Sequence, residues 1–444
     1  MCFIQIPLCL NPLSHILYTT LSKCSNKKLK KYKNGLTLAY YDMPELHSVS
    51  IGVFVNTGSV NETPKTNGLS HFIEHTMFKG TKRRTAFDIV ADTDAMGANI
   101  NAYTSKTATC YYIQCVDNDF ENCADILSDI YFNSVFPADE LEKEKGVILE
   151  EIAMCNDTPD DLSYEIASTA FYKGHPLARP ILGSAKNVKS FTRDDVFRYM
   201  DERYTADNTV IAVAGNVCFE KVDEIVEKYF IGNFTRIKSK KRKIDVPETH
   251  SVYVKKFKKI EQSNINILFP STSYNDETFN AVKIFNSAFG FGMSGRLYQH
   301  IRERLGLAYS VYSYLSAYKQ AGHGMIYLGT NVQNVERALE AVRKEIEEVK
   351  RTGLTDDEFL RGKAQIKSAF VFGLETSIGN MNLLGKHALL TGEVADVEEL
   401  IGKIDAVTPD DVRKAIDVNY DLSKATVGYV GPRIDKNLLD ILKN

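Results

Sequence analysis

The sequence has no long apolar run and no regular cysteine pattern. Nowhere in its 444 residues does it reach the roughly 18 to 20 consecutive apolar residues that a membrane helix needs, so we predict no membrane span. Its eight cysteines include no C-x-x-C pair. Scattered cysteines in a chain of this length favour free thiols in a reducing compartment over a disulfide scaffold.

A strong charge imbalance is also absent. The formal net charge is −3, which gives no overall argument for a nucleic-acid partner. Residues 1–22 contain no charged side chain, which matches neither a secretory signal with its basic start nor an arginine-rich mitochondrial presequence. We therefore predict that residues 1–30 form a disordered N-terminal extension that ends in a solvated basic segment. A targeting role is the alternative.

The most informative segment is His71-Phe72-Ile73-Glu74-His75. A helix turns by about 100° per residue, so His71 and His75 lie about 40° apart, with Glu74 about 60° to the other side of His71. Two neutral imidazoles suit zinc, and a neighbouring carboxylate outside the ligand set can take a proton from a zinc-activated water. The segment therefore predicts a zinc site with Glu74 as general base. It supplies only two ligands.

A second helical segment, 140–155, offers the third ligand. Its apolar stripe consists of Leu141, Ile148 and Ile152. Glu150 lies on the opposite side of this helix, whereas Glu151 and Glu144 lie on one margin of the buried face, two turns apart. We therefore predict that Glu151 is the third zinc ligand, that Glu144 supports the site or handles protons, and that Glu150 is exposed to solvent.

The second half of the chain repeats the first faintly. The segment 192–196 (TRDDV) recurs as 408–412 (TPDDV), and 138–141 (ADEL) recurs as 356–359 (DDEF), with nearly the same offset. Continuing the second alignment along the chain pairs Glu144 with a glycine and Glu151 with an alanine, and the second half has no H-x-x-E-H. We therefore expect one metal site per chain, in the first half only.

These features predict an α+β fold of two similar domains, each a mainly antiparallel sheet with helices packed on one face. We assign residues 31–235 to a zinc-binding catalytic domain and residues 251–444 to a non-metal repeat domain. Residues 236–250 are rich in lysine and form a basic linker between them.

The first domain has a readable order of elements. Apolar residues predict strands at 36–41 and 49–55, joined by a hairpin at Pro44, and a strand pair follows at 98–116. The helix with the histidines is expected to run from about Asn67 to Gly80, because glycine is favoured just beyond a helix C-terminus.

Taken together, these motifs resemble the inverzincin zinc peptidases of the pitrilysin family, in which H-x-x-E-H is followed by a distant glutamate. Here that glutamate is Glu151. The segment 301–309 (IRERLGLAY) is similar to the family's second-half signature. The pattern is similar to bacterial two-domain processing peptidases and to the β-subunit of mitochondrial processing peptidase.

The resemblance implies roles for further residues. His71, His75 and Glu151 match the ligands of one zinc ion, Glu74 the general base and Glu144 an auxiliary glutamate. Arg302 and Tyr309 match an arginine and a tyrosine that help to hold the substrate and the tetrahedral intermediate. In two-domain relatives this pair is expected to act in trans, which implies a homodimer or a heterodimer with a paralogue.

The resemblance also implies how substrate binds. Asn101 and Ala102 match an edge strand that pairs with an extended peptide through main-chain hydrogen bonds. Phe78 matches an aromatic pocket for the residue after the cleaved bond. Asp161 and Glu165 match acidic positions that receive an upstream arginine in the processing peptidase.

We therefore expect a zinc-dependent endopeptidase that hydrolyses extended peptides or unfolded proteins with a zinc-activated water. The alternatives are a non-catalytic or partner-dependent scaffold subunit of a heterodimeric processing peptidase, and another zinc hydrolase. A G-x-G-x-x-G pattern at Gly290 does not predict a dinucleotide site, because helix-like sequence precedes it where a strand is required. We expect a bacterial cytoplasmic location, with the mitochondrial matrix as the alternative.

Overall fold

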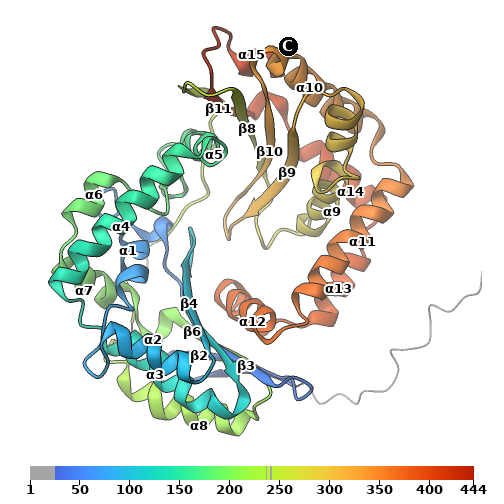
Figure 1. Cartoon of the computed structure of the whole chain (residues 1–444). Helices are drawn as coiled ribbons and strands as arrows, with labels where there is room; N and C mark the ends of the chain where they lie inside the picture. The colour runs from blue at the N-terminus through green and yellow to red at the C-terminus, as the bar shows by residue number, and fades with distance from the viewer. Residues whose placement is uncertain (1–25, 237, 241–242) are drawn as a thin grey trace, which may run out of the picture.

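The computed structural model describes residues 26–236, 238–240 and 243–444, which form two sheet-based halves arranged as an arc (Figure 1). The α+β prediction of two related domains is confirmed. The domain boundaries near 235 and 250 stay predictions. No helix in the described part of the chain combines the length and the apolar composition that crossing a membrane requires.

The first sheet has six strands in the order β1-β2-β6-β3-β5-β4. These strands are β1 (Lys27–Lys31), β2 (Thr37–Asp42), β3 (Ser48–Val55), β4 (Asn99–Thr104), β5 (Thr109–Val116) and β6 (Thr209–Gly215). The β2–β6 pair is parallel, and the other pairs are antiparallel. Strand β4 has a single neighbour, β5, so its outer edge is unpaired by any described strand.

Two local predictions for this sheet are wrong. No hairpin at Pro44 joins β2 to β3, because β6, whose residues are all buried, lies between them and pairs with both. Residues 27–30, which we placed in the extension, belong to edge strand β1 (Lys27–Lys31). Lys28 and Lys31 are exposed, and charged side chains are common on edge strands, so a basic composition does not exclude this strand. Residues 1–25 of the predicted extension lie outside the described residues.

Helices from the same half cover one face of the first sheet. They are α1 (Leu69–Thr76), α2 (Ala86–Ala95), α3 (Phe120–Asn133), α4 (Ala138–Asp157), α6 (Ala185–Ser190), α7 (Arg193–Arg203) and α8 (Phe219–Tyr229). Alternate residues of β3, such as Val49 and Ile51, join these helices in one apolar core, because successive strand residues point to opposite faces. The histidine helix is shorter than predicted and ends at Thr76.

The second sheet has five strands in the order β7-β11-β8-β10-β9. They are β7 (Tyr253–Phe257), β8 (Gln262–Ser271), β9 (Ser310–Ala317), β10 (Gly322–Asn331) and β11 (Thr426–Gly431). Its own helices are α9 (Phe279–Gly290), α10 (Val335–Thr352), α11 (Asp356–Gly373), α13 (Val397–Asp405), α14 (Pro409–Val418) and α15 (Leu438–Lys443). Helices α4 and α11 begin at the two segments that the sequence repeat pairs with each other, so the repeat relates equivalent helix starts.

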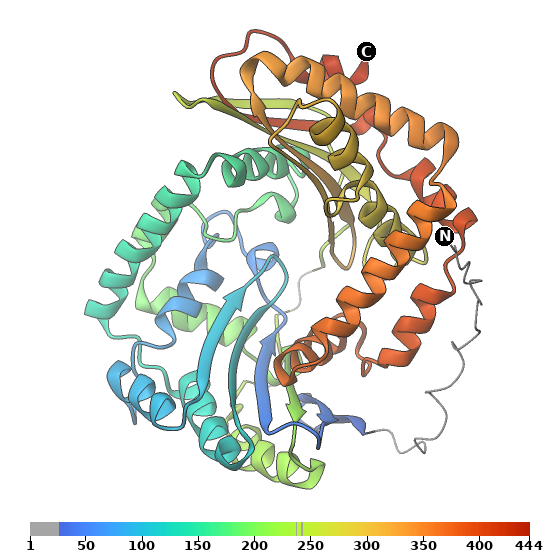
Figure 2. The ribbon, with the colours of Figure 1, turned by 45° about the vertical axis from the view of Figure 1, so that its right-hand side comes forward.

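The two halves exchange one helix each. Helix α5 (Pro159–Phe171) lies between α4 and α6 of the first half in the sequence, yet its Ala167 and Phe171 pack on β8 and β10 of the second sheet. Helix α12 (Ser377–Thr391) belongs to the second half, yet its Met381 and Leu384 pack on the free face of the first sheet. Figures 1 and 2 show both crossings. Each sheet is therefore covered on its second face by the other half.

Each exchanged helix lies so close to its sheet that a glycine is needed at the contact. A Cβ atom at Gly385 of α12 would lie 2.3 Å from the ring of Phe54 on β3. A Cβ atom at Gly428 of β11 would lie 2.4 Å from the carbonyl oxygen of Ser163 on α5. The second crossing is also tied by His323 of β10, whose two ring nitrogens lie 3.0 Å from the hydroxyls of Tyr164 and Tyr172.

We predict that Gly385→Ala lowers the free energy of unfolding by about 1–3 kcal/mol, because the added methyl group overpacks the buried contact with Phe54. The matched control is Gly402→Ala in α13, where a Cβ meets nothing within 4 Å. That change should raise the free energy of unfolding by about 0.5–1 kcal/mol through helix propensity. Urea denaturation measures both. Equal effects of the two substitutions would contradict tight packing of α12.

Candidate metal centre

The histidine helix begins at Leu69 because of Gly68 and Glu62. Gly68 has a left-handed backbone (φ 101°), and a Cβ there would lie 2.6 Å from the carbonyl oxygen of Leu182, so glycine is required. The buried carboxylate of Glu62 accepts hydrogen bonds of 2.8 Å from the amide N–H groups of Gly68 and Ser70. An anion at a helix N-terminus also interacts favourably with the helix dipole. Both features fix where the helix starts.

Three donor atoms from α1 and α4 lie close together. Nε2 of His71 lies 3.6 Å from Oε2 of Glu151, and Nε2 of His75 lies 3.7 Å from the same oxygen. One ligand atom from each residue lies within 4.8 Å of the others, and no other such group of three occurs in the part of the chain that the structure describes. The helix-phase argument thus selected side chains that do meet.

These three residues fit a small divalent cation. Ligands at about 2.0–2.1 Å around a tetrahedral ion lie about 3.3–3.4 Å apart, only a few tenths of an ångström closer than the distances observed here. Oε2 of Glu151 is buried and has no hydrogen-bond partner among the described residues. Burial, together with the neighbouring His75, lowers the pKa of His71 to about 4, so its imidazole is neutral and its lone pair is free to bind metal at pH 7.

Glu144 lies between His75 and Lys79. It is buried, and its Oε2 lies 3.3 Å from Nδ1 of His75, while the ammonium of Lys79 donates to its Oε1 at 2.6 Å. A carboxylate on Nδ1 fixes the imidazole tautomer that presents Nε2 to a metal, and it orients the ring. Lys79 in turn compensates the buried charge of Glu144. Glu150, as expected, is exposed.

Glu74 lies beside the donor atoms and is held from the first sheet. The hydroxyl of Thr104, the last residue of edge strand β4, donates a hydrogen bond to Oε2 of Glu74. Burial raises the pKa of Glu74, which favours a carboxyl group that accepts and returns a proton near neutral pH. The edge strand and the carboxylate of Glu74 are therefore in direct contact.

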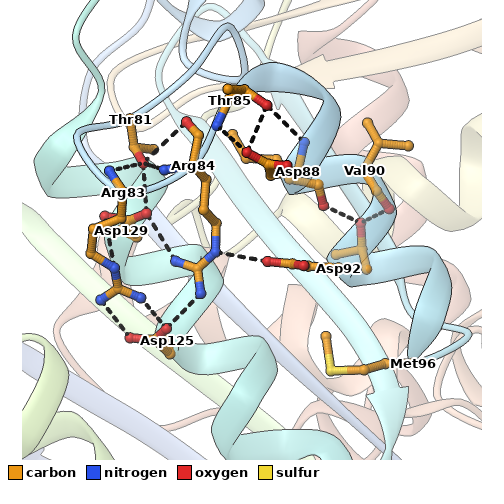
Figure 3. A network of polar contacts seen from close by, with 12 residues as sticks. Thr81, Arg83, Arg84, Thr85, Asp88, Val90, Asp92, Met96, Asp125 and Asp129 are labelled. Atoms are coloured by element: carbon orange, nitrogen blue, oxygen red, sulfur yellow. Dashed lines mark hydrogen bonds and ion pairs between the residues drawn. The ribbon is translucent and has the colours of Figure 1, made fainter.

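Ion pairs fix the segment that follows α1 (Figure 3). Arg84 donates hydrogen bonds to Asp129 and Asp125 of α3, at 2.9 and 2.8 Å, and to Asp92 of α2 at 3.0 Å. The hydroxyl of Thr81 also donates to Asp129, whose side chain is 0% exposed. The network joins the segment that follows α1 to the neighbouring helices α2 and α3.

The residues expected to bind substrate are spread around this centre. Asn101 and Ala102 lie on β4, which is an edge strand of the first sheet as predicted. Phe78 lies just beyond α1 and packs against Tyr111, with ring centroids 6.3 Å apart. Asp161 and Glu165 lie on exposed positions of α5. Their roles stay predictions.

Arg302 and Tyr309 lie in the second half, next to each other. Arg302 is in a π-helical turn (Tyr298–Arg304), and its guanidinium lies 5.4 Å from the centre of the Tyr309 ring. Tyr309 is 75% exposed. No described contact connects either residue with His71, His75 or Glu151 of the same chain, so within one chain the pair and the metal centre are separate.

Sequence reasoning missed Lys79 and Thr104. Lys79 comes four residues after His75, so its spacing was a usable signal, because a residue at i+4 can reach the same side of a helix. Thr104 lies on a strand well beyond Glu74 in the sequence, and no periodicity relates the two positions.

Comparisons with known families match both halves. The family described as "Insulinase (Peptidase family M16)" matches residues 37–185, and the one described as "Peptidase M16 inactive domain" matches residues 190–366. "Uncharacterized zinc protease YmxG" of Bacillus subtilis is 38% identical over 381 residues, which cover 85% of this chain and 92% of that protein. "Uncharacterized zinc protease SCO5738" of Streptomyces coelicolor is 35% identical over 409 residues, 90% of this chain and 89% of that protein.

Solved structures share the fold at low sequence identity. A crystal structure titled as a peptidase M16 inactive domain from Pseudomonas fluorescens has a TM-score of 0.86 and 19% identity, and covers 92% of this chain and 99% of its own. A protease from Helicobacter pylori has a TM-score of 0.83 and 19% identity, with 91% and 99% covered. Both neighbours therefore carry the two-sheet arrangement described above.

We predict that Asp129→Asn lowers the free energy of unfolding by about 1.5–3 kcal/mol, because it weakens charge-assisted hydrogen bonds in a buried position. The control is Asp92→Asn, which loses an ion pair with the same guanidinium at a side chain that is 49% exposed. Solvent screening should limit that loss to less than about 1 kcal/mol. Thermal and urea unfolding measure both variants. A larger effect at Asp92 would contradict the role assigned to burial.

Proposed function

The chain belongs to peptidase family M16, and from this premise we propose that it is a zinc-dependent endopeptidase. The observation that carries the proposal is the convergence of His71, His75 and Glu151 beside Glu74, which is itself held by the edge strand. Its bacterial relatives are named zinc proteases, which supports a hydrolase acting on peptide bonds.

We propose that His71, His75 and Glu151 hold one zinc ion per chain, with two neutral imidazoles and one carboxylate as ligands. When bound, zinc supplies Lewis-acid chemistry, since it polarises a carbonyl group and lowers the pKa of water. The glutamate Glu144 fixes the ring of His75, and Lys79 fixes Glu144. The second half has no counterpart of these ligands in its sequence, in keeping with the description of its matching family as inactive.

Glu74 is the proposed general base. It accepts the proton of the attacking water at its carboxylate and delivers this proton to the amine that leaves. Thr104 holds one carboxylate oxygen, which leaves the other oxygen to exchange the proton. The pKa of Glu74, raised by burial, suits both steps because the protonated form must persist until the amine departs.

The substrate is proposed to be an extended peptide or a segment of unfolded protein. It would add to the outer edge of β4, where Asn101 and Ala102 offer main-chain groups that no described strand uses. Phe78 would contact the residue after the cleaved bond. Asp161 would attract an upstream basic residue more strongly than Glu165, because the ammonium of Lys106 already interacts with the carboxylate of Glu165.

Arg302 and Tyr309 are proposed to act on the centre of a second copy or of a paralogue. The exposure of Tyr309, and the absence of described contacts between the pair and the metal residues of the same chain, support a role in trans. A dimer would then form the complete site. We also propose a bacterial cytoplasmic location, with the mitochondrial matrix as the alternative; the bacterial origin of the relatives supports the bacterial part of this proposal.

The first test removes the base. Glu74→Gln should retain zinc, measured by metal analysis after gel filtration, and should lower cleavage of unfolded peptides by about 10²- to 10⁴-fold. His71→Gln should instead lose the metal. If the wild-type chain binds zinc but cleaves no peptide, alone or as a dimer, the partner-dependent scaffold replaces the proposal.

The second test asks whether the site is shared between chains. Glu74→Gln and Arg302→Ala are each expected to be inactive as homodimers. After mixing and subunit exchange, about a quarter of the wild-type activity should return, because about half of the dimers are mixed and each holds one intact centre. Complementation by Arg302→Ala requires action in trans. No recovery, despite mixed dimers detected by mass spectrometry, would place Arg302 in the same chain's site or outside it.

A further inference from the structure

A cavity of about 660 Å³ lies where the two halves meet. Its walls come from the tip of the β4–β5 hairpin, the end of β9, the start of α9 and the exchanged helix α12. In Figure 1 these elements face one another in the interior of the arc. The volume lies in the range of sites that bind small molecules or peptide segments, and it greatly exceeds that of a single ion.

The lining of this cavity is basic. It includes Lys106, Lys283, Lys386 and His387, and no aspartate or glutamate is found among its described lining residues. Four tyrosines also line it: Tyr103, Tyr274, Tyr314 and Tyr318. Ammonium and phenol groups beside apolar side chains such as Leu315 and Leu383 favour an anionic ligand with an apolar body.

Two of the lysines have no acidic partner within ion-pair distance in the described structure. Lys283 is partly buried, its ammonium lies 5.3 Å from the centre of the Phe279 ring, and burial lowers its pKa. Lys386 lies over the ring of Tyr103 at 5.0 Å. Lys106 differs, because Glu165 and Glu62 act on its charge.

The partial burial of the charged Lys283 ammonium therefore costs desolvation free energy that no ion pair within the described structure offsets. Lys283 also lines an adjoining hollow of about 640 Å³ whose walls include acidic residues, but none of these described residues forms an ion pair with it. A partly buried cation without a partner disfavours the folded state unless an anion arrives to bind it. This points to a ligand rather than to a structural role.

The position of the cavity indicates where the anion comes from. Tyr103 and the residue after Thr104 line the cavity, whereas Thr104 itself contacts Glu74. Alternate residues of a strand point to opposite faces. The cavity therefore lies on the face of β4 that α12 covers, and the metal centre lies on the other face of β4. Alternate side chains of a peptide on β4 would point towards these same two faces.

We propose that this cavity binds a carboxylate of the peptide that lies along β4, with Lys283 and Lys386 as the recognising cations. The carboxylate is either an acidic side chain or the peptide's C-terminal group. The inference rests on the proposed peptide-binding function, and it adds a preference for acidic substrates that is distinct from the upstream basic preference of Asp161.

Direct binding tests this without cleavage. The protein is the full-length Glu74→Gln chain loaded with zinc, and the probes are three ten-residue peptides with a neutral fluorophore on a blocked N-terminus. One has a free C-terminal carboxylate and no acidic residue, one has a C-terminal amide and one glutamate, and the third has the amide with glutamine in place of glutamate. Fluorescence anisotropy should show about tenfold tighter binding of one of the two carboxylate peptides than of the glutamine peptide. Tighter binding of the glutamate peptide would identify an acidic side chain as the ligand, and tighter binding of the free-acid peptide would identify the C-terminal carboxylate.

The discrimination should disappear when Lys283→Met and Lys386→Met are added, and it should persist with Lys344→Met, an exposed lysine of α10 without a described ion pair. Equal affinity for the three peptides overturns the inference alone, whereas no binding of any peptide overturns the proposed function as well.

Thermal melting tests whether Lys283 instead has a structural role. Lys283→Met should melt at the same or a higher temperature, because it removes a partly buried, unpaired charge. A lower melting temperature would show that Lys283 stabilises the fold and would overturn its assignment as a recognising cation.

Discussion

The exchange of α5 and α12 is the constraint from which the rest of the architecture follows. Each sheet packs helices of its own half on one face, and its second face is covered by a helix from the other half. Because α5 is anchored on the second sheet, the preceding helix α4 must span from one sheet to the other. On that path α4 passes α1, which brings Glu151 and Glu144 to the histidines.

The chemistry of the centre depends on this tertiary placement as much as on the motif. One helix provides two imidazoles, but the charges that orient and balance them come from elsewhere. Glu144 is held between His75 and Lys79, and Glu74 is held by Thr104 of the edge strand. The strand proposed to bind the substrate therefore also positions the proposed base. The hydrogen bond from Thr104 to Glu74 links β4, where the peptide would bind, to the carboxylate that would transfer the proton.

Local periodicity explains what the sequence could predict. Helix phase selected Glu151 and Glu144 over Glu150, because side-chain direction within a helix depends only on spacing. The hairpin at Pro44 failed because strand neighbours are chosen by burial over long distances, and β6, which comes much later in the chain, separates β2 from β3. For the helix exchange, the only related signal in the sequence was the internal repeat. A repeat reveals similarity between halves but not which half a helix packs on.

The repeat shows why only the first half brings these donor side chains together. Its alignment places Gly362 of α11 where α4 has Glu144. A Cβ at Gly362 would lie 2.8 Å from the carbonyl oxygen of Ile284 and 3.0 Å from the Cβ of Ala288, so α11 and α9 touch through their backbones. In the first half the corresponding position holds a carboxylate that faces an imidazole. The pair α4 and α1 therefore leaves room for charged side chains, whereas α11 and α9 close that room by packing, so a glutamate at 362 would first have to separate two buried helices.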